Sequence, residues 1–549
     1  MKRFATRAPC IPDNSQTWAW RQWMFHKTRE KFASVPASLP AAGVLATIVI
    51  MAVLATWPVS ARAADVPPLR SVVIDGSTVY SPAALFATYR RQLGHPLTRE
   101  GTQAIAAAIA ARYAADGYAR PELRHDPALA AEGVLRINVF EPHLARVTIE
   151  GTPGRHRGAM ERIAAGLLES RPLRRNDIPV ALAAMRQLRG LTVKAATRPD
   201  GTVRNAHELV LQAEFAPVAG VARMNNRGTD QVGRLFVLGQ VEANDLFGWN
   251  EQFGLVFAAA TDTEEYRSGG LYLDAPLGGG GTRGMLMLFR SDSAPNEAPV
   301  NLADEYLRER VTLRFSHPLR QSADRSLTLS GALEAENLEV DRNGTLIRDD
   351  RLRVLEAGLR TTWRAGDATQ FSSKFELRQG LDALGSGLRA DDLPVDPRSV
   401  DFLLAQLQLT SFTRLGANWS LRVDSYAQYS ADVLPDSERF KIGGERLGRG
   451  FEVTEIAGDQ GLGAKLLLRR ELPGGTTAWG RPSVYGFYDI GAAWKQDIDG
   501  RESAATLGAG VALHGTRLSG YVEVATPMTH ADVEGKRSAL VFAELSIRF

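Results

Sequence analysis

From residue 216 to the C-terminus, the chain consists of short segments in which apolar residues alternate with polar or charged residues. The alternation is clear around Phe375 and Leu421, and clearest in the last segment, where Glu544, Ser546 and Arg548 are flanked by apolar residues. Successive side chains of a strand point to opposite faces, so each segment has one apolar and one polar face. This pattern predicts an antiparallel transmembrane β-barrel, with the apolar faces toward lipid and the polar faces lining a wet lumen.

The connections between these segments predict the topology. We count sixteen segments, and the short connections between them alternate with long polar ones along most of the region. A closed up-and-down barrel with short periplasmic turns and long outer loops has this arrangement. The first two outer hairpins look tight and the turn at 471–482 is long, so these depart from the rule. The expected short connections are 244–250, 277–282, 320–325, 365–367, 414–417 and 515–517, and the long ones are 291–304, 337–350, 380–398, 434–461, 495–503 and 527–537.

Residues 64–142 predict a small α+β domain. The order is a strand at 72–74, a helix over 82–93, a second helix after Thr98, and strands over 118–124 and 134–140. In the second helix Ile105, Ile109 and Tyr113 recur at i, i+4 spacing, which places them on one buried face.

The same order recurs in residues 143–215. Val147 to Gly151 repeats the first strand and its glycine turn. Helices over 157–169 and 177–188 follow, and then strands near 192–197 and 208–215 with an Asp-Gly turn between them. The barrel is therefore expected to be preceded by two similar α+β domains.

The N-terminal residues 1–63 have the features of an extended signal peptide. Lys27, Arg29 and Lys31 precede an apolar stretch over 41–57, and small residues around Ala63 predict cleavage there. Met24 is an alternative start, and a retained membrane anchor is the alternative interpretation. No later stretch has the roughly 18 apolar residues that a spanning helix needs. An exported chain of this kind is either soluble in the periplasm or a barrel.

Composition narrows the function classes. A net charge of +3 argues against a dedicated nucleic-acid binder, and the sole cysteine, Cys10, lies in the expected signal peptide. The catalytic and phosphate-binding motifs that we sought do not occur, and His207-Glu208 lacks a second histidine at metal-binding spacing. We therefore expect no enzyme, no catalytic residue, no cofactor and no metal site.

One outer connection is unusual for a solvent loop. It contains Gly443-Gly444-Glu445-Arg446-Leu447-Gly448-Arg449-Gly450-Phe451-Glu452, in which glycines and apolar residues surround two arginines. Two strands later comes Phe487-Tyr488-Asp489-Ile490-Gly491. Period two places Phe487, Asp489 and Gly491 on the lumen face. A carboxylate in a narrow lumen needs a partner, because an unpaired buried charge is costly.

These residues carry a family resemblance. The two N-terminal domains resemble POTRA domains, on the Tyr113…Gly117-Tyr118 helix ending and on Leu188-Arg189-Gly190-Leu191-Thr192-Val193, in which Arg189 replaces a proline. The loop and the Phe-x-Asp-x-Gly strand are similar to the paired signatures of the two-partner secretion transporters, the haemolysin/haemagglutinin secretion-activation proteins. Asn226-Arg227-Gly228 and Asn244 to Gly248 also fit that pattern. One feature departs from it: members of the family usually carry an N-terminal helix and linker that plug the pore, but here only residues 64–69 precede the first domain.

The resemblance implies roles for particular residues. Arg449 would pair with Asp489 inside the barrel, Gly450 would permit a tight backbone, Phe451 would complete the loop signature, and Gly491 would leave room for the loop. A terminal aromatic such as Phe549 resembles the signal that the barrel assembly machinery reads.

The resemblance also implies a function and a location. POTRA domains in the periplasm would capture an unfolded secreted partner protein, and a barrel surrounded by outer-membrane lipid would pass it to the surface of a Gram-negative cell. A factor that inserts other barrels into the membrane is the nearest alternative. A passive porin and a soluble periplasmic adhesion protein are further alternatives.

Overall fold

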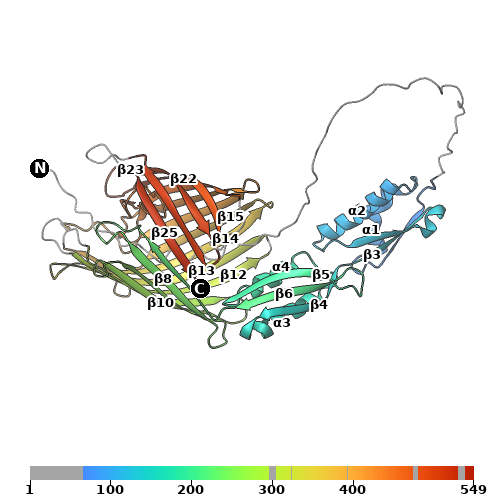
Figure 1. Ribbon diagram of the computed structural model, residues 1–549, viewed down its shortest axis with the longest axis horizontal. Coiled ribbons are helices and arrows are strands. Elements are labelled where there is room, and N and C mark those ends of the chain that lie inside the picture. Colours follow the sequence, from blue (N-terminus) through green and yellow to red (C-terminus); the bar gives the residue numbers. More distant parts are fainter. Residues whose placement is uncertain (1–65, 296–303, 323, 392, 474–479, 530–537) are drawn as a thin grey trace, which may run out of the picture. The chain divides into compact units, whose positions relative to one another are not determined.

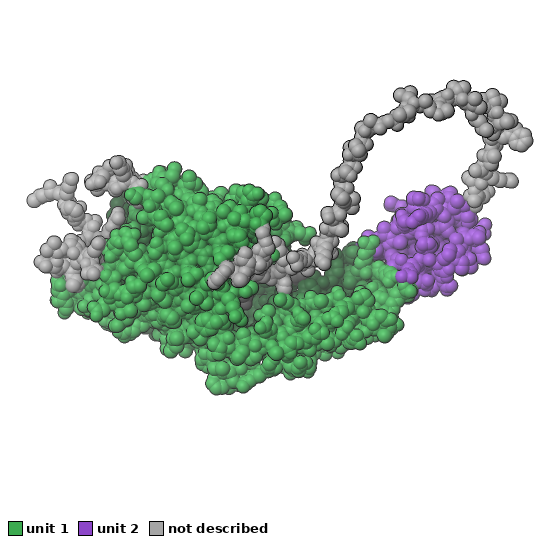
Figure 2. Space-filling view, viewed as in Figure 1, with its two compact units in different colours: residues 1–11, 113–122, 140–549 green, residues 12–112, 123–139 purple. Residues whose placement is uncertain are grey.

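The computed structural model describes residues 66–295, 304–322, 324–391, 393–473, 480–529 and 538–549. The expected signal peptide lies outside these residues. Two compact units are distinguished (Figure 2), one of which includes residues 66–112 and 123–139, while the other includes 113–122 and 140–549. No described helix is long and apolar enough to cross a membrane.

The first module is a three-stranded sheet with two helices (Figure 1). The sheet has the order β1-β3-β2, and β1 runs parallel to β3. Ile105, Ile109 and Tyr113 of α2 are fully buried, as their spacing predicts. The elements are β1 (Ser71–Asp75), α1 (Pro82–Tyr89), the 3₁₀ turn η2 (Arg90–Gln92), α2 (Arg99–Ala115), β2 (Glu122–Asp126), the 3₁₀ turn η3 (Pro127–Glu132) and β3 (Val134–Phe140).

The second strand of this module begins later than predicted. The strand expected over 118–124 starts at Glu122, immediately after Pro121. A proline has no backbone N–H to donate to a ladder, so the strand can form only beyond it.

The second module repeats the arrangement, with the sheet order β4-β6-β5. β4 runs parallel to β6, and β5 pairs with β6 antiparallel. Its core is formed by α3 and α4 packed on the sheet, around Leu144, Met160, Met185 and Leu211. The elements are β4 (His143–Thr152), the 3₁₀ turn η4 (Gly154–His156), α3 (Arg157–Glu169), α4 (Asp177–Met185), β5 (Leu191–Pro199) and β6 (Ala206–Phe215).

Apart from β19 and β20, the remaining strands form a closed antiparallel barrel of 16 strands among the described residues, with the short β16 not counted separately, which confirms the predicted fold (Figure 1). The short β16 extends the ladder of β14. The strands are β7 (Val218–Asn225), β8 (Phe236–Asn244), β9 (Gln252–Ala260), β10 (Tyr266–Pro276), β11 (Arg283–Ser293), β12 (Asp304–Gln321), β13 (Arg325–Arg342), β14 (Thr345–Ala365), β15 (Thr369–Gly380), β16 (Gly387–Ala390), β17 (Leu403–Arg414), β18 (Trp419–Ser430), β21 (Gln460–Glu471), β22 (Arg481–Trp494), β23 (Arg501–His514), β24 (Leu518–Pro527) and β25 (Leu540–Arg548).

The two faces of the barrel strands differ as the alternation predicts. On β15 the outward Phe375 and Leu377 are exposed, while Glu376 between them is buried. On β25 the outward Val541 and Leu545 are exposed and Ser546 is buried. Large apolar side chains on the outer surface are favourable in a membrane, because they contact lipid hydrocarbon and not water.

The connection expected as a long loop at 337–350 is instead a tight hairpin, so that prediction was wrong. β13 and β14 continue until Arg342 pairs with Thr345, leaving a two-residue turn. The turn residues Asn343 and Gly344 both have positive φ, at 51° and 76°. This is the geometry of a type I′ turn, for which Asn-Gly is the preferred pair.

The barrel closes where β25 meets β7, over the five residue pairs from Glu544–Asn225 to Arg548–Val221. Beyond the paired residues, the side-chain amide of Asn226 accepts from the Ala543 backbone at 2.7 Å and donates to the Val541 carbonyl at 2.9 Å. At the other end, the backbone of Phe549 exchanges hydrogen bonds of 2.9 and 3.1 Å with Gly220. The seam is therefore extended at both ends by contacts outside the strand pair.

Candidate functional site

The connection from β18 to β21, residues 431–459, is here named the inserted loop. It contains a small hairpin of β19 (Phe440–Ile442) and β20 (Ile456–Gly458). Gly443 and Gly444 follow β19 with φ of 120° and 83°, a backbone region that residues with a Cβ rarely adopt. The glycines thus reverse the chain at the start of the segment that carries Arg449.

The inserted loop packs its apolar side chains against the lumen face of the barrel wall. Phe451, Leu447 and Ile442 are almost fully buried. They form a cluster with the other loop residues Phe440 and Ile456 and with the wall residues Tyr426, Ala493 and Ala504. Burial of this apolar surface favours the position of the loop inside the barrel over one in water.

Three wall glycines provide the space for this packing. A Cβ on Gly491 would lie 3.0 Å from Ile442 and Leu447, and one on Gly463 would lie 2.3 Å from Leu447. A Cβ on Gly461 would lie 2.0 Å from the Phe440 ring. The expected role of Gly491, to leave room for the loop, therefore has a geometric basis that also extends to Gly461 and Gly463.

Arg449 contacts Asp489 of β22 through three hydrogen bonds. Its Nε donates to Oδ2 at 2.9 Å, its Nη2 donates to Oδ1 at 2.7 Å, and its backbone N–H donates to Oδ2 at 3.2 Å. Both side chains are at most 5% exposed. The guanidinium also lies over the Phe487 ring, 3.4 Å from its centroid. A forked, desolvated pair of this kind combines charge with fixed geometry.

Arg449 also forms an ion pair with a second carboxylate. Glu523 of β24 lies 3.5 Å from Arg449 Nη1 and accepts from the Tyr485 hydroxyl at 2.8 Å. Glu523 also pairs with Arg227 at 2.5 Å, and this arginine comes from the connection after β7. Two arginines and two carboxylates therefore alternate in the order Asp489, Arg449, Glu523, Arg227, so that no charge of the four is left without a partner.

The other predicted residues occupy distinct positions. Phe451 is buried with the apolar cluster of the loop. Gly450 lies against the wall, and its N–H donates to Thr506 Oγ1 at 3.2 Å. A Cβ there would lie 2.9 Å from the Pro527 nitrogen. Its φ is outside the left-handed region, so glycine is required for close approach to the wall and not for a tight turn.

Phe549 lies apart from these residues. Its ring covers Gly220 at the seam, where a Cβ on the glycine would meet the ring at 2.3 Å. The structure thus brings Arg449, Gly450, Phe451, Phe487, Asp489 and Gly491 together and leaves Phe549 at the barrel's closing strand.

Sequence reasoning missed Glu523 and the glycines Gly461 and Gly463. A signal for Glu523 was present, because it stands between Val522 and Val524, and period two places a charge flanked by valines on the lumen face. The two glycines carry no comparable signal, since their role depends on which side chain packs opposite them.

Comparisons with known proteins agree with this architecture. A profile of the haemolysin secretion/activation protein family ShlB/FhaC/HecB matches residues 208–515, and a profile of the ShlB-type POTRA domain matches residues 68–141. The outer membrane transporter CdiB of Dickeya dadantii strain 3937 is 22% identical over 418 residues, covering 72% of this chain and 71% of CdiB. CdiB of Escherichia coli is 24% identical over 515 residues, covering 87% and 82% of the two chains.

A solved structure shows the same fold. CdiB from Escherichia coli superposes with a TM-score of 0.68 at 20% identity, covering 90% of this chain and 93% of that one. The family profile spans more than half of the 549 residues. The chain therefore belongs to the haemolysin secretion/activation protein family, and it is an outer-membrane transporter of two-partner secretion whose partner is a secreted exoprotein.

Proposed function

We propose that the chain takes up its exoprotein unfolded in the periplasm and conducts it through the barrel, and that the Arg449–Asp489 pair holds the inserted loop and so sets the conducting state. The second part rests on the buried contact between these two residues, which consists of two side-chain hydrogen bonds and one from the Arg449 backbone. We assign residues 64–142 and 143–215 to two POTRA-like domains and 216–549 to the barrel.

The edges of the two small sheets support capture of an unfolded client. β1 and β2 are the outer strands of the first sheet, and β4 and β5 those of the second. Most residues of β5 are exposed. An edge strand offers backbone N–H and C=O groups to which an extended polypeptide can add as a further strand. Such recognition reads the client backbone and suits a client that arrives unfolded.

The biogenesis of the barrel implies further partners. The exposed apolar outer face suits the hydrocarbon of outer-membrane lipid. The terminal Phe549, which directly follows the strand that closes the barrel, is the residue that we propose the barrel assembly machinery recognises. No catalytic chemistry, nucleotide or nucleic acid enters this mechanism.

Deletion of the gene tests the proposal against the alternative of a barrel insertion factor. We expect one protein, or a few, to disappear from the culture supernatant, with the outer-membrane barrels unchanged. A general fall in the barrel complement would favour the alternative. Accumulation of the missing exoprotein in a folded, protease-resistant form in the periplasm would contradict uptake of an unfolded client.

A further inference from the structure

The neck of the inserted loop, residues 431–439, is fixed to the barrel wall by its own buried ion pair. Glu438 is 7% exposed, and Arg378 of β15 binds its carboxylate in a forked arrangement. Arg378 Nε donates to Oε2 at 2.9 Å and Nη2 donates to Oε1 at 2.7 Å. Paired hydrogen bonds between charged groups are the strongest that side chains form, and they fix orientation as well as distance.

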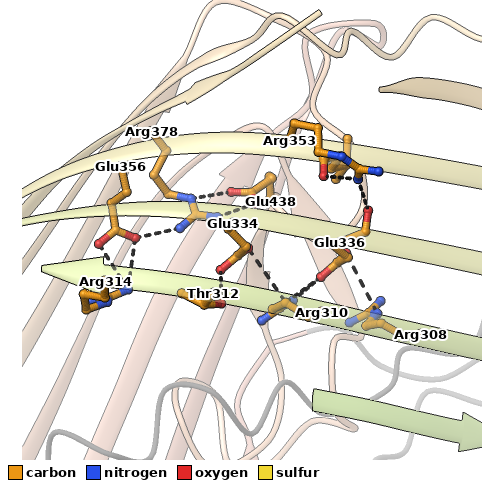
Figure 3. A network of polar contacts seen from close by, with 11 residues as sticks. Arg308, Arg310, Thr312, Arg314, Glu334, Glu336, Arg353, Glu356, Arg378 and Glu438 are labelled. Carbon is orange, nitrogen blue, oxygen red and sulfur yellow. Dashed lines mark hydrogen bonds and ion pairs between the residues drawn. The ribbon is translucent and has the colours of Figure 1, made fainter. Parts of the chain in front are cut away.

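Arg378 is itself held by the wall. Figure 3 shows its guanidinium between Glu438 of the loop, Glu356 of β14 and Glu334 of β13. Glu356 also pairs with Arg314 at 3.2 Å, and Glu334 lies 3.7 Å from Arg310. The arginine is thus preoriented by carboxylates of the wall, and the loop contributes one further carboxylate to this set.

Other contacts of the neck converge on the same part of the wall. Asp436 lies 2.9 Å from Arg348 of β14. The Gln428 side chain donates to the Glu438 carbonyl at 2.8 Å. Leu434 is fully buried in an apolar cluster with Leu352, Val354, Phe402 and Leu404. These partners come from β14, β17 and β18 and from the residue before β17, whereas the carboxylate partners of Arg449 come from β22 and β24.

We propose that Glu438 is a second positioning residue of the inserted loop, which keeps the neck docked on β15 when the tip with Arg449 leaves its seat on β22. Loss of the Glu438 carboxylate leaves the buried Arg378 with one partner fewer. The ion pair then no longer stabilises the contact between the neck and Arg378. The loop would pivot about its neck and not leave the barrel as one body. This inference concerns the mechanics of the loop, and it holds whether or not the Arg449–Asp489 pair sets the conducting state.

Cysteine labelling of the full-length protein tests the proposal. In a Cys10→Ser background, Ser437→Cys reports on the neck and Leu447→Cys reports on the tip. Each reporter is combined with Glu438→Gln or with Arg449→Ala. The labelling rate with a maleimide is measured in detergent, on protein whose heat-shifted gel mobility shows that the barrel is folded. Glu336→Gln is the matched control, because Glu336 is an equally buried carboxylate whose Arg310 partner belongs to the wall.

We expect Glu438→Gln to raise the labelling rate several-fold at position 437, and Glu336→Gln to leave it unchanged. Arg449→Ala should raise the rate at position 447 several-fold and leave position 437 protected. An unchanged rate at 437 in Glu438→Gln would overturn the proposal. Equal exposure of both positions in Arg449→Ala would overturn it as well, since the loop would then move as a single body. Supernatant levels of the exoprotein, measured in the same variants, report separately on transport.

Discussion

Gly463 of β21 and Gly491 of β22 are register partners on the lumen face, and the side chain of Leu447 fills the space that their missing side chains leave. The wall therefore holds the loop by close packing as well as by an ion pair. Packing of this kind depends on side-chain volume, so it can be tested without changing any charge.

Gly463→Val should unseat the loop, because the added carbon atoms would occupy the position of Leu447. Overpacking of this kind costs about 1–3 kcal/mol. Leu447→Ala in the same chain should restore part of the loss, so the double variant should be less destabilised than the sum of the single variants. The measurement is the temperature at which the heat-shifted gel band disappears. Gly269→Val is the control, because a Cβ there meets only a carbonyl oxygen at 3.8 Å. Strict additivity would contradict the packing argument.

Arg449→Glu should abolish secretion while the barrel still inserts. The variant places an anion beside Asp489 and Glu523, and breaking a buried pair by removal of one partner costs about 3–5 kcal/mol. Exoprotein in the supernatant and heat-shifted mobility of the transporter are measured together. Arg446→Glu, an exposed arginine of the same loop, should secrete normally. Normal secretion by Arg449→Glu would exclude the proposed role of the pair.

Phe549→Ala should lower the amount of assembled barrel in the outer membrane several-fold, because it removes the aromatic ring and keeps the backbone hydrogen bonds to Gly220. The purified variant should refold in detergent as well as the parent does, which separates recognition during biogenesis from stability. Ile547→Ala removes an outward aliphatic side chain on the same strand and should assemble normally. Equal losses in both variants would point to general destabilisation of the last strand.

The second module should lose stability in acid through Glu208. Hydrogen bonds from Arg146 and Thr148 to the carboxylate lower the pKa of Glu208 below its ordinary value of 4.5, and the nearby Arg198 acts in the same direction. A lowered pKa in the folded state adds stability above pH 4.5, and this contribution disappears as the pH falls through the folded-state pKa. Hydrogen exchange of β4 and β6 at pH 7 and at pH 3 measures the effect. Glu208→Gln should exchange faster than the parent at pH 7, and this difference should shrink at pH 3, whereas the exposed Glu214→Gln should match the parent at both.

Much of the fold could be predicted because it depends on local periodicity. The position of Glu376 between Phe375 and Leu377 identifies the lumen face of β15, even if the neighbouring strands are not known. The spacing of Ile105, Ile109 and Tyr113 identifies the buried face of α2 in the same way. The contact between Arg449 and Asp489 could be anticipated because an inward carboxylate needs a cation, and the resemblance supplied the candidate.

The rest depends on contacts between distant segments. Whether Glu438 meets Arg378 is decided by how far the loop reaches across the lumen, and no spacing in the sequence reports that distance. The hairpin at Asn343-Gly344 was missed for a different reason. Alternation marks a strand where one face is apolar and the other polar, and around this turn both faces carry charged residues. The Asn-Gly pair was the remaining signal.

That hairpin has a consequence for the shape of the transporter's outer mouth. β14 has 21 residues, whereas a strand crosses a membrane with about 9–11. At about 3.3 Å per residue, the remainder of the strand can rise some 30 Å beyond the hydrocarbon. One side of the barrel, formed by β12, β13 and β14, therefore continues beyond the membrane as a stiff wall. A polypeptide that leaves the barrel meets this wall on one side. The wall therefore restricts the directions in which the exoprotein can begin to fold.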